Sequence, residues 1–154
     1  MLRRPAGWWQ PWLALGLFGF LLHFVWEMLQ VPFYEGMERA DHWGAVLRCT
    51  QAAFGDVLIG WVAYAVAAAW ARDRWWLGTS HRRRALTVLI GTGLLITGTL
   101  EWLNVYVWQR WAYSPDMPVV LGIGLTPLLQ WLILPVLTVW LARRHVGLAS
   151  GGMK

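Results

Sequence analysis

Four stretches of about twenty mostly apolar residues constrain this chain more than any other feature of its sequence. They cover residues 11–31, 50–71, 85–107 and 119–142. A helix of about 20 apolar residues is long enough to cross the hydrocarbon core of a bilayer. Charged residues make up only 14% of the 154 residues, whereas soluble domains have roughly 25%. We therefore predict an all-α integral membrane protein with four transmembrane helices in a single domain.

Basic residues divide the segments outside these stretches into two sets. The two termini and the 72–84 loop carry ten of the thirteen lysine and arginine residues. These ten are Arg3, Arg4, Arg72, Arg74, Arg82, Arg83, Arg84, Arg143, Arg144 and Lys154. By the positive-inside rule, we predict a multi-pass protein of the inner (cytoplasmic) membrane, with both termini and this loop in the cytoplasm. The sequence has no recognisable nucleic-acid-reading motif, so the charge favours the lipid bilayer over nucleic acid as a partner.

A short motif recurs in the two halves of the chain. EMLQV at residues 27–31 is followed 74 positions later by EWLNV at residues 101–105. We therefore predict two related helical hairpins, residues 1–74 and 75–154. Because both hairpins start on the same side of the membrane, they form a parallel repeat about an axis along the membrane normal.

Four ionisable residues lie within the predicted spans: His23, Glu27, Asp56 and Glu101. A charged side chain at the centre of a membrane helix costs about 2.5–3.5 kcal/mol, so such residues are candidates for function. At 1.5 Å per residue, the three acids lie about 6–10 Å below the outer ends of their helices, and the repeat brings Glu27 and Glu101 towards one another. We predict a buried polar pocket in the outer half of the bilayer, with these four residues as catalytic groups. Because burial and repulsion disfavour neighbouring charges, we expect at least one carboxyl to be protonated at neutral pH.

Further polar and aromatic residues fall on the same helix faces and are predicted to bind a ligand. Spacings of three or four residues place side chains on one side of a helix. These residues are Gln30, Thr97, Asn104, Trp108 and Gln130. Gln130 also lies 74 positions after Asp56, so the repeat places these two residues at equivalent positions.

Carboxyl groups in an apolar pocket suit proton transfer to a small lipophilic ligand. A neutral carboxylic acid can donate a proton to a double bond, and a neighbouring carboxylate or His23 can remove one. Three alternatives remain open: a polar network that only locks the helices together, a small proton-coupled carrier, and a non-catalytic subunit of a larger membrane complex. A homodimer also remains open.

Two short motifs resemble families of membrane enzymes. WAYSPDMPVVLGIGLTP at residues 111–127 resembles the W-x-Y/F…G-I…P pattern of the heterodimeric membrane lycopene cyclases, which also have related halves. Those cyclases follow the proline with paired glutamates, where this chain has Leu129 and Gln130. HFVWE at residues 23–27 is similar to the His-x-x-x-Glu motif of the sterol-isomerase superfamily, which has a four-helix membrane fold. These resemblances imply isomerase- or cyclase-like chemistry on an isoprenoid-type substrate.

No cofactor is predicted, although one divalent metal ion held by His23, Glu27, Asp56 and Glu101 remains an alternative. His23 is the only histidine deep within a predicted helix, which excludes haem held by two histidines of one chain. The single cysteine, Cys49, excludes an internal disulfide and a multi-cysteine metal centre, and it has no predicted role.

Overall fold

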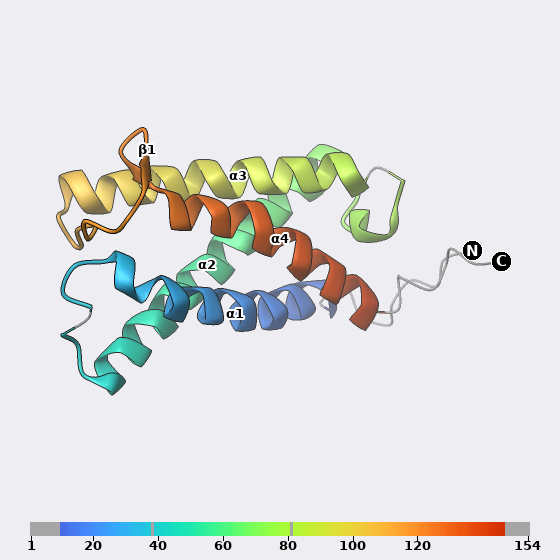
Figure 1. The fold of residues 1–154 in the computed structure, drawn as a ribbon. Coiled ribbons are helices and arrows are strands. Elements are labelled where there is room, and N and C mark those ends of the chain that lie inside the picture. The colour runs from blue at the N-terminus through green and yellow to red at the C-terminus, as the bar shows by residue number, and fades with distance from the viewer. Residues whose placement is uncertain (1–9, 38, 81, 147–154) are drawn as a thin grey trace.

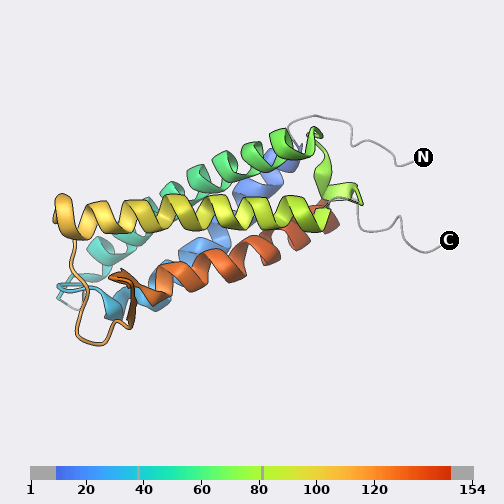
Figure 2. The same cartoon turned by 90° about the horizontal axis from the view of Figure 1, so that it is seen from above.

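The computed structural model describes residues 10–37, 39–80 and 82–146, and this part of the chain forms a bundle of four long helices (Figures 1 and 2). The helices are α1 (Gln10–Gln30), α2 (His42–Ala71), α3 (Arg82–Trp102) and α4 (Leu125–His145). Each contains a segment long and apolar enough to cross a membrane. The prediction of an all-α architecture with four candidate membrane spans is thus confirmed.

Helices that follow one another in the chain run in opposite directions, so the bundle has two distinct ends (Figure 1). At one end α1 begins, α4 ends, and a short 3-10 helix η2 (Trp76–Gly78) joins α2 to α3. We call this the arginine-rich end. The opposite end carries the 3-10 helix η1 (Val31–Phe33) after α1 and a π-helical segment η3 (Leu103–Val107) after α3. We call it the hairpin end, because a short β-hairpin lies there just before α4.

Each long helix packs against two others. α1 and α3 both contact α2 and α4, which places α1 diagonally opposite α3. The apolar core is centred near the arginine-rich end, where Trp76 and Leu77 of η2 are fully buried beneath Tyr64 of α2. The Tyr64 hydroxyl donates a hydrogen bond of 2.7 Å to the carbonyl of Arg74, which fixes the loop between α2 and α3.

The outer surface of the bundle is apolar. On α1, exposed Leu13, Leu17, Leu21 and Val25 follow one another at intervals of four residues and form a stripe along the helix. In water such a stripe would have to be buried, whereas lipid chains are as apolar as leucine. The surface therefore matches contact with a lipid bilayer.

The second helix begins at His42, eight residues before its predicted start. Asp41 caps this helix, because its side chain accepts a hydrogen bond of 3.3 Å from the backbone N–H of Gly44. The predicted boundary at residue 50 is wrong because His42 and Arg48 interrupt the apolar residues of the first two turns, and hydropathy places the start of the span after Arg48.

The fourth helix begins at Leu125 and not at residue 119. Residues Val119–Val120 (β1) and Ile123–Gly124 (β2) pair as an antiparallel hairpin. Its two turn residues, Leu121 and Gly122, have φ angles of 53° and 80°, which is the pattern of a type I′ turn. The run of apolar residues here continues unbroken from strand into helix, so hydropathy could not separate them.

Two matching contacts support the predicted repeat. A Cβ atom added at Gly93 would lie only 1.9 Å from the Trp131 ring, and one added at Gly19 would lie 3.8 Å from Val57. Gly93 lies 74 positions after Gly19, and Trp131 lies 74 positions after Val57. The repeat and the membrane orientation remain predictions. Arg3, Arg4 and Lys154, on which the orientation partly rests, lie outside the described residues.

Candidate functional site

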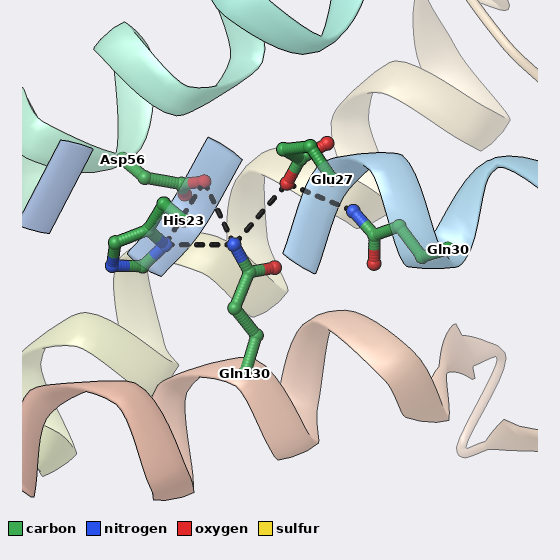
Figure 3. A network of polar contacts seen from close by, with 5 residues as sticks. All are labelled: His23, Glu27, Gln30, Asp56 and Gln130. Atoms are coloured by element: carbon green, nitrogen blue, oxygen red, sulfur yellow. Dashed lines mark hydrogen bonds and ion pairs between the residues drawn. The ribbon is translucent and has the colours of Figure 1, made fainter. Parts of the chain in front are cut away.

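A buried polar cluster joins three helices around the side chain of Gln130 (Figure 3). Its amide nitrogen lies 2.7 Å from His23 Nδ1 and 3.1 Å from a Glu27 oxygen, both on α1. The same nitrogen lies 2.9 Å from an oxygen of Asp56 on α2. The structure thus brings together four of the predicted site residues, from both halves of the chain.

One ring nitrogen and two carboxyl oxygens surround the Gln130 amide nitrogen. A glutamine NH₂ group carries two hydrogens, so it can donate to Glu27 and Asp56 together. His23 Nδ1 also lies 3.2 Å from the same Asp56 oxygen, and it donates to that oxygen in the tautomer with its proton on Nδ1. The tautomer of His23 thus decides which of these contacts are hydrogen bonds.

Burial differs among the members of the cluster. Gln130 and His23 are 2% and 4% exposed, and His23 also packs against the Trp131 ring at a centroid distance of 5.5 Å. Glu27 is only partly buried, and Gln30 donates a hydrogen bond of 2.8 Å to it. Glu27 and Asp56, which is also partly buried, are therefore the members of this cluster that keep some exposed surface.

Glu101 occupies separate surroundings on α3. One of its oxygens accepts hydrogen bonds from the Tyr113 hydroxyl at 2.7 Å and from the Trp111 indole at 3.4 Å. Both donors belong to the loop between η3 and β1, which folds back over the hairpin end. Each glutamate thus accepts hydrogen bonds from two donors, but Glu27 accepts them from two glutamine amides of the helices and Glu101 from two aromatic side chains of the loop.

The loop that covers Glu101 is held in place by the segment after α1. Tyr34 and Tyr113 form an isolated antiparallel bridge, and their rings lie 5.7 Å apart. The Ser114 hydroxyl donates a hydrogen bond of 3.0 Å to the carbonyl of Pro32. These contacts close the hairpin end of the bundle above the polar residues.

Both bridging tyrosines remain protonated in this position. Burial, then the charge of Glu101 and then that of Glu27, raise the pKa of Tyr34 far above its ordinary value. Burial and next the hydrogen bond to Glu101 raise the pKa of Tyr113. Both hydroxyl groups therefore keep their protons at neutral pH.

The remaining predicted residues do not join the Gln130 cluster. Thr97 and Asn104 are buried on α3 and η3, and the Asn104 amide donates to the carbonyl of Leu100 at 2.7 Å. Trp108 is 52% exposed and packs under the Arg110 guanidinium, which places it outside the interior.

Sequence reasoning did not select Tyr34, Trp111 or Tyr113. Aromatic residues next to membrane spans are typical anchors at the bilayer surface, so their type alone gives no reason to place them at an interior glutamate. Their role depends on a loop that folds back across the bundle, and no spacing within the chain reveals that contact.

A small cavity extends from His23 and Asp56 towards the arginine-rich end. Its volume is about 30 Å³, which is enough for about two water molecules. Thr138 and Trp131 line it, and each has a buried polar atom without a hydrogen-bond partner in the part of the chain that the structure describes. The cavity is thus small and partly polar.

Within the described ranges, no three side chains of His, Cys, Asp or Glu are arranged to hold a metal ion. At the place where His23, Glu27 and Asp56 converge, the amide nitrogen of Gln130 takes the central position. Glu101, the fourth residue of the alternative metal set, bonds to Tyr113 instead.

Comparison with protein-family models, with curated proteins and with solved structures finds no match for this chain. The chain is thus a small four-helix protein with candidate membrane spans and buried polar residues, and its function has to be inferred from this geometry.

Proposed function

We propose that this protein is an intramembrane enzyme that moves a proton on a small lipophilic substrate of isoprenoid type. One observation carries the proposal: Glu27 and Glu101 lie on diagonally opposite helices in contrasting hydrogen-bond surroundings. Pairs of titratable groups in contrasting environments are typical of acid–base catalysis.

Glu101 suits the role of base. Hydrogen bonds from Tyr113 and Trp111 hold its carboxyl group in a fixed orientation. The tyrosine keeps its proton at neutral pH, since its pKa is raised. An oriented carboxylate of this kind can remove a proton from a carbon next to a developing cation.

Glu27 suits the role of acid. Its carboxyl group and that of Asp56 contact the same Gln130 amide, and repulsion between two neighbouring carboxylates favours a proton on one of them. Transfer of this proton to a carbon–carbon double bond forms a C–H bond and leaves a carbocation. Loss of a proton from an adjacent carbon to Glu101 then restores a double bond at a new position, so atoms and charge balance.

The surroundings also suit an apolar substrate. Exposed Met28 and Leu29 flank Glu27 on the bilayer side of α1, and aromatic rings of the type present at Tyr34 and Trp111 stabilise cations. The resemblances to lycopene cyclases and sterol isomerases imply the same class of substrate and chemistry.

Deuterium transfer from solvent tests this proposal without knowledge of the natural product. Purified protein in lipid vesicles is incubated in D₂O with farnesol, squalene and lycopene, and deuterium bound to carbon is measured by mass spectrometry. We expect incorporation with the wild type, and a loss of at least about 100-fold in Glu27→Gln and in Glu101→Gln.

The matched control is Glu35→Gln, which removes the same charge from an exposed position at the hairpin end. It should retain wild-type incorporation. Absence of deuterium from all three isoprenoids with folded wild-type protein, or equal incorporation by all variants, would overturn the proposal.

The cavity beside His23 favours a second candidate, a proton-coupled carrier. It extends the polar cluster towards the arginine-rich end, along the direction that a transmembrane proton path would take. A carrier would move protons across vesicles under a pH gradient, as measured with an enclosed pH-sensitive dye, and Asp56→Asn would abolish the movement. An enzyme would leave the gradient unchanged in both proteins.

A further inference from the structure

A second, much larger cavity lies at the arginine-rich end, away from the polar cluster. Its volume is about 500 Å³, within the range of about 300–1,000 Å³ that is typical of ligand pockets. It is lined by Trp12, Ala65, Ala68, Ala69, Arg72, Asp73, Arg74 and Trp75. The polar residues of the proposed function take no part in it.

The floor and walls of this cavity are apolar. Ala65, Ala68 and Ala69 lie three and four residues apart, so they form one face of the last turns of α2. Trp12 of α1 and Trp75 of the loop after α2 also line the cavity. Small side chains between two indole rings leave a trough along the helix, which fits a hydrocarbon chain.

The mouth of the cavity is cationic. Arg72 and Arg74 are both exposed, and they follow directly on the end of α2. Within the described part of the chain, neither guanidinium group has a hydrogen bond or an ion pair. The intervening Asp73 does not neutralise them through a direct contact, because its carboxylate accepts a hydrogen bond of 2.8 Å from the backbone N–H of Trp75.

The backbone holds the two arginines in position. Arg72 has a φ angle of 51° and closes α2, because its N–H bonds to the carbonyls of Ala68 and Ala69. This bond satisfies the last carbonyls of the helix, which would otherwise repel an anion. The hydrogen bond from Tyr64 to the carbonyl of Arg74 fixes the next turn.

We propose that this cavity is a binding site for one anionic phospholipid. The phosphate lies between Arg72 and Arg74, whose planar guanidinium groups match its oxygen atoms. One acyl chain follows the alanine face of α2 between Trp12 and Trp75, at the depth where tryptophan side chains meet the membrane interface. The site is independent of the proposed enzymatic function.

Native mass spectrometry of the full chain in detergent tests this proposal. Phosphatidylglycerol and phosphatidylcholine are each titrated in, and the fraction of lipid-bound protein is measured. We expect phosphatidylglycerol to bind more tightly. The double variant Arg72→Gln/Arg74→Gln should weaken phosphatidylglycerol binding by about 10- to 30-fold, because each basic residue near an anionic headgroup contributes to affinity.

Two controls separate a specific site from general charge attraction. Arg83→Gln/Arg84→Gln removes the same charge from exposed positions at the same end, outside the cavity, and should change binding less than twofold. Ala65→Trp fills the trough and should lower the affinity for both lipids, whereas Ala52→Trp, at another exposed alanine of α2, should not.

Three results would overturn the proposal. An equal loss of phosphatidylglycerol affinity in the two arginine double variants would show that the lipid is attracted by the net charge of the protein alone. Because both lipids carry a phosphate and only phosphatidylglycerol has a net negative charge, equal binding of the two would exclude a site selective for an anionic headgroup. Unchanged binding by folded Ala65→Trp protein would show that the trough does not hold the acyl chain of the lipid. The trough would then be the binding site for residues 1–9 of this protein or for a second copy of it.

Discussion

The first two helices and the last two each carry a glutamate in a similar short motif, EMLQV and EWLNV, yet the two glutamates have different surroundings. Glu27 lies beside Gln130 of α4, and the amide of Gln130 also contacts Asp56 and His23. Glu101 bonds to the loop that follows its own helix, through Tyr113 and Trp111. A similar local sequence thus places a carboxyl on each helix, while its partners decide what the carboxyl can do.

Helix packing shows the same divergence. Gly93 provides the space into which the large Trp131 ring packs, and 74 positions earlier Gly19 faces the smaller Val57. Packing at Gly93 therefore depends on the missing side chain far more than packing at Gly19 does. Substitutions in the two pairs of helices should therefore differ in their effect on stability.

The largest effect is expected for Gly93→Ala. The new methyl group would lie 1.9 Å from a ring carbon of Trp131, and this clash should lower the free energy of unfolding by about 3 kcal/mol or more. Gly19→Ala should change it by less than about 1 kcal/mol, because its nearest neighbour is 3.8 Å away. Thermal unfolding in detergent measures both, and similar values would refute the asymmetry.

Gln130→Leu should have the next largest effect, a loss of about 2–3 kcal/mol in the free energy of unfolding. It removes the donor shared by Glu27, Asp56 and His23, and unsatisfied buried polar groups cost about 1–3 kcal/mol each. Gln51→Leu, at an exposed position of α2, is the matched control and should be nearly neutral. If both variants unfold at the wild-type temperature, the contacts of Gln130 do not stabilise the packing of α4 against α1 and α2.

A smaller effect is expected at the loop that covers Glu101. Tyr113→Phe removes a hydrogen bond of 2.7 Å and should cost about 1.5 kcal/mol, since the acceptor is a carboxylate. Trp111→Phe removes a bond of 3.4 Å, which is longer and weaker, and should cost about half as much or less. Chemical denaturation of the purified variants measures the difference. The reverse order would show that Trp111 is the main donor.

The smallest effect concerns alkaline pH. An unfolded tyrosine has a pKa of about 10, whereas the pKa values of Tyr34 and Tyr113 are raised in the folded protein. Above pH 10 the unfolded chain releases these protons and the folded protein keeps them, so the free energy of unfolding falls as pH rises. Tyr34→Phe and Tyr113→Phe should each make the decline between pH 9.5 and 11 shallower. A decline as steep as that of the wild type in both variants would contradict this coupling.

The sequence predicts the spans and the meeting of the polar helix faces, because both follow from local periodicity. His23 and Glu27 are four residues apart on one face of α1, and the 74-residue offset places Gln130 opposite Asp56. The boundary at residue 119 could not be predicted well, since Val119–Val120 is as apolar as the helix after it. The partners of Glu101 could not be predicted either, because they depend on a long loop folding back.

The π-helical segment Leu103–Val107 has a consequence for how this loop reaches Glu101. Its wide turn, in which the N–H of Trp108 bonds to the carbonyl of Leu103 at 2.7 Å, accommodates one more residue than an α-helical turn. If the same residues were wound as a regular α-helix, everything after them would be rotated by about 100°. The aromatic donors would then swing away from the carboxylate, although all four spans would keep their length and composition. The additional residue in this wide turn thus sets the orientation of the loop that covers Glu101.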